Sequence, residues 1–384
     1  MADMTDDLLA FAQELVQIKS FSGQEEEAAK LIASKMKALQ FDEVKIDRYG
    51  NVLGRVGEGE RSLLFDSHTD VVNVTDEDRW EVPPFSGEIM EGFLWGRGSV
   101  DMKSAIAASI YAAAIAKNQG LLSGKTVFVS CTVDEETCDG VGLKHLLEEC
   151  HIRPDYGVIC EPSANTISIG HKGKVQVIIK TYGVSAHGSA PELGRNAIYE
   201  MAEIIQRVER TNNKYLPRNG KKSTLVMSQI SSTSVSLNAI PSECQAYLDR
   251  RMIVGETEQT IRDEMDSIIA GKNATWEIGT LHRTTWTGEK ITYEPFHPAW
   301  EISLQHELTK ALISAYSDTY GYAPNKFDFW DFSTNAVALV DMGIPCIGFG
   351  PGDNKLAHKL NEKCAISQIV EACEVYTHLI KHIA

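Results

Sequence analysis

Residues Ser62–Asp70 read SLLFDSHTD, an apolar run typical of a buried strand that ends in a histidine and an aspartate. The same arrangement recurs in Thr126–Glu136 (TVFVSCTVDEE) and in Tyr156–Glu161 (YGVICE). In open α/β sheets the carboxyl ends of parallel strands face one crevice, because the loops that leave them converge there. The sequence therefore predicts an α/β fold in which acidic and histidine side chains from distant segments meet.

The segments around these runs alternate between helical and strand patterns, which is typical of the α/β class. We expect helices at 5–18, at 22–39, after Asp101, at 301–318 and at 366–382, and strands at 43–56, 62–67, 126–133, 156–160 and 344–348. Ser22 and Glu25 have the spacing of a capping box at the start of the second helix.

Residues 177–291 follow a different pattern. Strands are expected at 174–182, 224–231, 243–254 and 274–282, with helices at 195–210 and 257–270. This βαββαβ order predicts a ferredoxin-like α+β unit with one open sheet edge, which favours pairing with a second copy. We therefore expect residues 1–176 and 292–384 to form one α/β domain, and residues 177–291 to be an inserted domain.

The bulk properties exclude several classes of protein. The 384 residues include 43% hydrophobic and 23% charged residues, as in an ordinary globular protein large enough for two domains. The formal net charge of -16 disfavours a nucleic-acid or anionic-membrane partner and favours a small molecule. The eight cysteines form no CxxC pair, and the start lacks the pattern of a signal peptide. We expect a cytoplasmic location and reduced cysteines.

Several side chains are candidate metal ligands, although each has a simpler interpretation on its own. Asp70 is spaced to accept a hydrogen bond from the His68 ring and so fix its tautomer, but a histidine and a solvated acid also occur together at strand ends. Asp101 precedes a helix, where it suits an N-cap or a carboxylate bridging two ions. In an extended chain Glu135 and Glu136 point to opposite sides, which suits one base and one ligand.

Two further candidates complete a possible metal site. Glu161 ends an apolar run, and His358 follows the glycine-rich stretch Gly348–Gly352. Two histidines with several carboxylates fit two zinc or cobalt ions better than a closed, cysteine-rich structural site. A site of this kind keeps open positions and implies catalysis.

With these motifs in order, the chain resembles the M20 metallopeptidase family, which contains acetylornithine deacetylase, succinyl-diaminopimelate desuccinylase, carboxypeptidase G2 and aminoacylase. The resemblance covers the whole chain and rests on Ser67–Asp70, Gly96–Lys103 (GRGSVDMK), Asp134–Glu136 and Ala357–His358. It implies a zinc-peptidase-like catalytic domain with a mixed sheet flanked by helices, and a dimerisation or lid domain at 177–291.

The resemblance also implies roles for single residues. One metal would be held by His68, Asp101 and Glu161, and the second by Asp101, Glu136 and His358. Glu135 would be the general base, Asp70 would support His68, and the peptide bond from Asp101 to Met102 would be cis. His187, in Ala186–Ser189 (AHGS), would reach the active site of a partner subunit, although an exposed turn histidine is the simpler interpretation.

Two more positions resemble the substrate-binding residues of the family. Asn238 and Arg251 would bind the reacting carbonyl and the substrate carboxylate, although the adjacent Arg250 leaves the choice of arginine open. Asp328–Asn335 (DFWDFSTN) departs from the best-known members and resembles the branch named selenium-metabolism-linked hydrolases. We expect part of the substrate pocket there, and an aromatic core strand explains the pattern equally well.

The expected activity is hydrolysis of the amide bond of an N-acyl amino acid or a related small compound. The nucleophile would be a metal-bridging water, the metals would be two divalent ions, with zinc preferred over cobalt or manganese, and the enzyme would be a homodimer through the inserted domain. A dipeptidase or carboxypeptidase would use the same site. A non-catalytic receptor for amino-acid derivatives would need the ligands and Arg251, but not Glu135.

Overall fold

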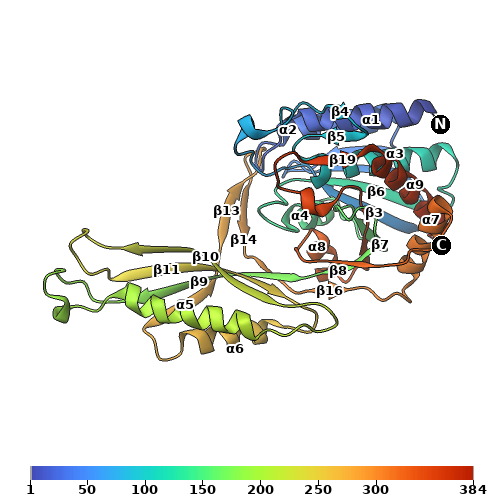
Figure 1. The fold of residues 1–384 in the computed structure, drawn as a ribbon. Coiled ribbons are helices and arrows are strands. Elements are labelled where there is room, and N and C mark those ends of the chain that lie inside the picture. The colour runs from blue at the N-terminus through green and yellow to red at the C-terminus, as the bar shows by residue number, and fades with distance from the viewer. Residues whose placement is uncertain (1, 384) are drawn as a thin grey trace.

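The structure is a computed structural model that describes residues 2–383. Figure 1 shows a larger body, which contains both labelled ends of the chain, and an elongated inserted domain that projects from it. The body is a mixed sheet flanked by helices and the inserted domain is an α+β unit, so the predicted fold class is confirmed.

The large sheet carries the residues that the sequence singled out. Its strands are β1 (Glu43–Ile46), β2 (Val52–Gly57), β3 (Arg61–His68), β6 (Lys125–Thr132), β7 (Tyr156–Ile159), β8 (Ser168–His171), β16 (Trp300–Glu301), β17 (Asp328–Trp330) and β18 (Cys346–Gly348). Their order is β1-β2-β6-β3-β7-β18-β8-β16, with β17 also beside β8. The neighbours β6, β3, β7 and β18 are parallel. Their carboxyl ends therefore lie along one edge of the sheet.

Helices cover both faces of this sheet (Figure 1). They are α1 (Ala2–Gln17), α2 (Glu26–Ala38), α3 (Ser104–Asn118), α4 (Val141–Glu149), α7 (Glu307–Tyr320), α8 (Ala336–Asp341) and α9 (Ile366–His382). The alanine-rich α3 is buried on nearly all sides between α1, α9 and the sheet. Its small side chains let these neighbours approach closely, and an all-round apolar helix belongs in a core. A short sheet of β4 (Ile89–Met90), β5 (Phe93–Trp95) and β19 (Lys363–Ala365) adjoins them.

The inserted domain has the predicted βαββαβ order. Its elements are β9 (Gly173–Tyr182), α5 (Ala197–Lys214), β10 (Thr224–Thr233), β11 (Glu243–Met252), α6 (Glu258–Ile269) and β12 (Ala274–Ile278). The strand order is β10-β11-β9-β12, and α5 and α6 cover one face (Figure 1). Side chains such as Val177, Met201 and Leu248 form a separate buried core. Most of the edge strand β10 is exposed.

The two ends of β9 lie far apart in the molecule. Gly173 pairs with Met252 next to the body, where β15 (Phe296–His297) also joins the sheet, whereas Tyr182 pairs with Glu243 at the distal end. The hairpin of β13 (Leu281–Thr284) and β14 (Lys290–Tyr293) returns the chain to the body (Figure 1). The proposed boundaries at 176/177 and 291/292 fall within β9 and β14 and stay predictions.

Three local expectations were wrong. The capping box is absent, because the Ser22 hydroxyl donates to Asp70 Oδ2 at 2.7 Å and Glu25 makes no side-chain cap. The strand expected at 274–282 breaks at Gly279 into β12 and β13, which belong to different sheets. The helix expected at 301–318 starts only at Glu307, since Trp300 and Glu301 pair with β8. Among the described residues, we find no helix with the length and apolarity needed to cross a bilayer.

Candidate metal centre and substrate cavity

The candidate ligands follow the parallel strands at one edge of the sheet. His68 is the last residue of β3, Glu135 and Glu136 follow β6, Glu161 follows β7, and His358 lies in the loop after β18. That last loop passes tightly over the end of β7, since a Cβ at Gly350 would lie 2.2 Å from the Cys160 carbonyl oxygen. Glycine is therefore required for the close approach that brings His358 to the site.

Asp101 lies between the two histidines. Its Oδ1 is 3.0 Å from His68 Nε2, and its Oδ2 is 3.2 Å from His358 Nε2. His68 Nε2 is also 3.7 Å from Glu161, and His358 Nε2 is 3.0 Å from Glu136. One carboxylate thus faces two clusters, each with its own histidine and glutamate. This is the arrangement that a bridging ligand between two ions requires.

A buried acid holds the Asp101 segment in place. Glu362 Oε1 accepts hydrogen bonds from the backbone nitrogens of Gly98, Val100 and Asp101, and Arg97 Nη1 donates to Glu362 Oε2 at 2.5 Å. Asp101 therefore lies in a fixed turn before α3, and the helix begins at Ser104 with Lys103 as its N-cap. The N-cap interpretation of Asp101 is wrong. The Asp101–Met102 peptide bond is cis, as the resemblance implied.

Asp70 supports the site in a way that the sequence did not indicate. The His68 Nδ1 atom is 2.9 Å from the Asp70 carbonyl oxygen and 3.5 Å from its carboxylate, so Nδ1 as donor leaves Nε2 for a metal. The Asp70 carboxylate itself accepts from the backbone nitrogens of Glu135 and Glu136, both at 3.1 Å. Asp70 therefore orients one histidine and both glutamates.

The two glutamates are not in an extended chain, contrary to expectation. β6 ends at Thr132, and Asp134 has a left-handed φ of 57°, so the backbone turns before Glu135. Glu136 points to His358, whereas Glu135 lies with His68 and Glu161, their ligand atoms all within 4.8 Å of one another. The two carboxylates still serve different partners, but a turn rather than strand alternation separates them.

The charges of the site fit bound cations. Burial raises the pKa of Glu135, Glu136 and Glu161, and neighbouring carboxylates raise it further. Burial also disfavours ionised Asp101, but hydrogen bonds from His358 and His68 outweigh that effect and lower its pKa. Crowded, buried carboxylates need compensating positive charge, and the mixture of histidine and carboxylate oxygen suits zinc, cobalt or manganese. The residues present therefore fit two divalent ions.

The family follows from comparison with known proteins. The family model described as Peptidase family M20/M25/M40 matches residues 64–382. The chain belongs to this family. The motif resemblance is thereby confirmed, and this M20 protein is a metallohydrolase of peptide or amide bonds with a candidate dinuclear metal site.

Relatives of this M20 protein cover nearly all of its length. It is 36% identical over 379 residues to YgeY of Escherichia coli K12, an alignment that covers 97% of this chain and 94% of YgeY. Aminopeptidase PepT from Bacillus cereus has a similar structure, with a TM-score of 0.75, 20% identity and coverage of 99% and 98% of the two chains. The Bacillus subtilis YXEP protein is a dinuclear metal binding peptidase from the M20 family. Its structure matches with a TM-score of 0.71 and 14% identity, and the match covers 99% of this chain and 98% of the YXEP chain. These two structures share the fold.

A cavity of about 270 Å³ adjoins the candidate metal centre of the M20 protein. Besides the acidic residues it is lined by Lys174, Arg251, Phe332 and Ser333. Asp328–Asn335 thus contributes to the pocket, as expected, while Trp330 of the same segment is buried in the core. The pocket interpretation of this segment therefore applies to Phe332 and Ser333, and the core-strand interpretation applies to Trp330.

The two adjacent arginines have different surroundings. Arg251 lines the cavity and is held through Nε and Nη2 by the Asp249 carboxylate at 2.7 and 3.0 Å. Arg250 is fully buried in the inserted domain, where Glu256 and Glu264 bind it at 2.7 and 2.8 Å. Arg251 is therefore the arginine that faces the cavity.

We expect this difference to separate two substitutions. Arg250→Leu should destabilise the protein by about 3–5 kcal/mol, since it leaves buried carboxylates without their cation. Arg251→Leu should leave the melting temperature nearly unchanged and raise KM roughly 10- to 100-fold, because it removes the donors that the family resemblance assigns to the substrate carboxylate. Thermal unfolding and steady-state kinetics on both variants check this. A loss of stability confined to the Arg251 variant would contradict the assignment.

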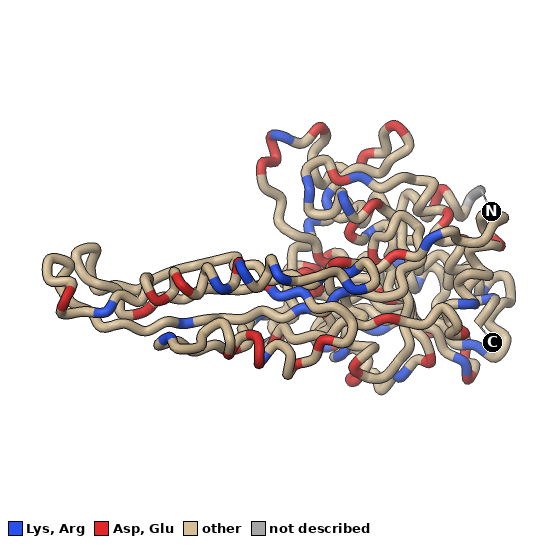
Figure 2. The backbone as a smooth tube through the Cα atoms, turned by 60° about the horizontal axis from the view of Figure 1, so that its bottom comes forward, with Lys and Arg blue, Asp and Glu red and all other residues tan. Residues whose placement is uncertain are grey.

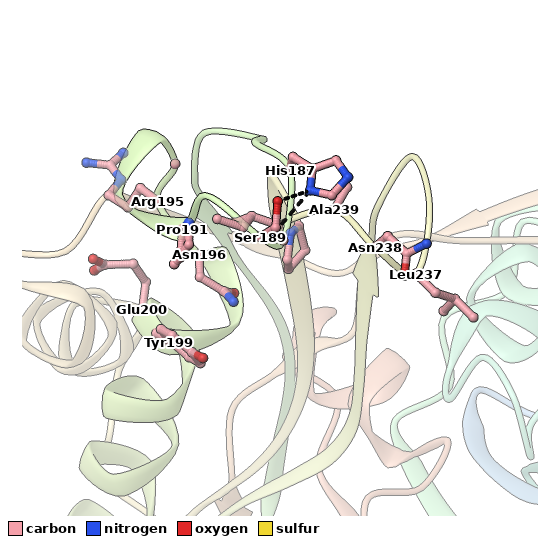
Figure 3. Close-up of a pocket in the computed structure, with 14 residues that line it drawn as sticks. His187, Ser189, Pro191, Arg195, Asn196, Tyr199, Glu200, Leu237, Asn238 and Ala239 are labelled. Carbon is pink, nitrogen blue, oxygen red and sulfur yellow. Dashed lines mark hydrogen bonds between the residues drawn. The ribbon is translucent and has the colours of Figure 1, made fainter.

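His187 and Asn238 lie apart from the candidate metal ligands of the same chain. They line an exposed hollow of about 790 Å³ at the distal end of the inserted domain, with none of the metal ligands among its lining residues (Figure 3). The His187 Nδ1 atom accepts from Ser189 N at 3.1 Å and lies 2.7 Å from Ser189 Oγ. The backbone of His187 forms an isolated antiparallel β-bridge with that of Ala239, which follows Asn238. The two residues thus lie together, away from the cavity that contains Arg251.

Sequence reasoning missed several residues around the site. Glu362 and Asp139 lie in loops without a distinguishing pattern, and Lys174 begins an expected strand that gives no sign of a functional lysine; only their partners in space mark them. For Ser22 a signal was present but was misinterpreted, because the Ser22 and Glu25 pair suggested a local cap. Both side chains instead reach toward the segments after β3 and β6.

Proposed function

We propose that the protein is a deacylase that hydrolyses the amide bond of an N-acyl amino acid, with two zinc ions held by the predicted ligands. The observation that carries the proposal is Asp101, whose two oxygens face His68 and His358 on opposite sides. The cavity beside it is small and is lined by Arg251, and the planar guanidinium of arginine suits a carboxylate, which supports a small anionic substrate.

Two divalent ions, when bound, supply Lewis-acid polarisation of the scissile carbonyl and increase the acidity of water. The residues of the chain supply the proton transfers and the orientation. Glu135 lines the cavity and accepts the proton of the attacking water at its carboxylate. It then gives that proton to the nitrogen of the leaving amine. Arg251 binds the carboxylate of the amino-acid half and so holds the amide over the metal ligands.

His187 and Asn238 fit this scheme only through a second subunit. Both lie at the exposed distal end of the inserted domain, and the edge strand β10 has open hydrogen-bonding groups along an exposed side. A homodimer formed through the inserted domain would bring His187 to the partner's cavity, where its ring would donate to the developing oxyanion and Asn238 would hold the carbonyl. The cytoplasmic location stays a prediction.

A substrate panel tests the proposal. Protein loaded with zinc or cobalt is assayed for release of free amine from N-acetyl, N-succinyl and N-formyl amino acids and from dipeptides. We expect turnover of acyl amino acids, and loss of that turnover when a chelator removes the metals. Preference for dipeptides would show a dipeptidase instead. If no compound of the panel releases free amine although two metals are bound per chain, the deacylase proposal is overturned and a receptor is favoured.

A further inference from the structure

Lys174 lies next to Arg251 in the cavity, although it belongs to another strand. Lys174 of β9 is the direct cross-strand partner of Arg251 in β11, and His297 of β15 is its partner on the other side. Directly opposite residues of an antiparallel pair point to the same face of the sheet, with Cβ atoms about 4.5–5.5 Å apart. Both cations line the cavity. Figure 2 shows acidic and basic segments gathered where the inserted domain meets the body.

Two like charges placed opposite each other are unfavourable unless other groups compensate them. Each cation here has its own carboxylate. Lys174 Nζ is 2.8 Å from Asp139, which follows the Glu135–Glu136 turn, whereas Arg251 is held by Asp249 of β11. The two carboxylates belong to different elements, so each cation is neutralised by a partner of its own.

Both cationic groups keep hydrogen-bond donors for a ligand. An ammonium group has three donors, and Asp139 takes one from Lys174. The Lys174 side chain is only 11% exposed, so its remaining donors lie in a site shielded from bulk water. Charged hydrogen bonds are stronger there than at an open surface. The cavity therefore offers two cationic side chains to a ligand. A substrate with a single carboxylate would need only Arg251.

We propose that Lys174 binds a second anionic group of the substrate, so that the enzyme prefers N-acyl derivatives of acidic amino acids. The α-carboxylate binds Arg251 and the side-chain carboxylate binds Lys174. This inference rests on the proposed function for the identity of the reaction, but it concerns a different contact and needs no role for Glu135, His187 or Asn238.

The test compares charged substrates with neutral ones of the same shape. The kcat/KM ratio of N-acetyl-L-glutamate to N-acetyl-L-glutamine, and of N-acetyl-L-aspartate to N-acetyl-L-asparagine, is measured on the metal-loaded enzyme. We expect the wild-type protein to prefer one of the acidic substrates by roughly 10- to 100-fold, the factor that a charged hydrogen bond supplies. A ratio near one for both pairs overturns the proposal.

The informative variant removes both charges of the buried pair. Burial disfavours ionised Asp139, but the Lys174 ammonium outweighs it and lowers the Asp139 pKa to about 2. Lys174→Met alone would leave that carboxylate without its cation, so the double variant Lys174→Met with Asp139→Asn is used. We expect its acidic-to-neutral ratio to fall close to one. Lys172→Met is the matched control, since Lys172 pairs with the exposed Asp331 and does not line the cavity. It should keep the wild-type ratio.

Calorimetric binding of L-glutamate and L-glutamine to the metal-loaded proteins separates this inference from the reaction. If no acyl amino acid is hydrolysed, the deacylase proposal fails, while tighter binding of glutamate that is lost in the double variant still supports the role of Lys174. An equal decrease for the charged and neutral ligands in the double variant would show that Lys174 only neutralises Asp139, and the inference would be wrong.

Discussion

Replacing Glu135 with glutamine is expected to lower kcat by roughly 10²- to 10⁴-fold, the usual contribution of general acid and base catalysis. Glutamine has nearly the same shape as glutamate but does not accept the proton of the attacking water. The backbone at this position is held by the Asp70 carboxylate through its 3.1 Å hydrogen bond to Glu135 N, so the substitution leaves the turn in place. Metal content, measured by elemental analysis, should stay at the wild-type value.

Glu136→Gln is the control for this prediction. Glu136 is adjacent in sequence and held by the same aspartate, but its side chain faces His358. We expect this variant to lose metal affinity as well as activity, because it removes a proposed ligand rather than a base. Equal turnover of the Glu135 variant and the wild-type enzyme would refute the role of Glu135. Loss of metal from both variants would instead make Glu135 a ligand.

His187→Ala is expected to lower kcat by about 10²- to 10³-fold, the range measured for the loss of one oxyanion-stabilising donor. The substitution should not disturb the fold, since the imidazole is exposed and contacts Ser189 in its own loop. Its metal content and melting temperature should match those of the wild-type protein. Such a decrease from a residue remote from the metal ligands of its own chain would point to action in a second subunit.

Mixed dimers test that origin directly. When the Glu135→Gln and His187→Ala chains are coexpressed, a mixed dimer contains one cavity with its own Glu135 and with His187 from the partner. Random pairing makes half of the dimers mixed, so about a quarter of wild-type activity should return from two nearly inactive parents. Two copies of the same variant coexpressed give the control. No gain over the parents would show that His187 does not act across subunits.

The sequence predicted the parts of the site that depend on strand order. Apolar runs locate β3, β6 and β7, and the rule for parallel strands places His68, Glu135 and Glu161 at one edge without coordinates. The local backbone conformation of the loops after these strands was harder to predict from the sequence. Asp134 has a left-handed φ, and the two residues that follow it, Glu135 and Glu136, donate backbone hydrogen bonds to Asp70. Asp70 lies more than sixty positions earlier in the sequence, so the local sequence does not predict this turn.

Residues with a supporting role could not be found from the sequence for the same reason. Glu362 holds the Asp101 turn from a position 261 residues later, and nothing in its neighbourhood marks it. Lys174 differs from surface lysines only through its pairing with Asp139 and its register with Arg251. Periodicity reports which face of an element is buried, but it contains no information about partners on other elements.

The strand β9 runs from the cavity to the distal end of the inserted domain. Lys174 is near the strand end that adjoins the body, whereas His187 follows the other end, about 30 Å away at the usual rise per residue. A rotation of about 10° at the junction would therefore displace the distal end by about 5 Å, given that rise, and leave the contacts of Lys174 and Arg251 almost unchanged. If the proposals for Lys174 and His187 hold, substrate binding at one end of β9 and contact of His187 with a second subunit at the other end would depend on separate parts of one strand.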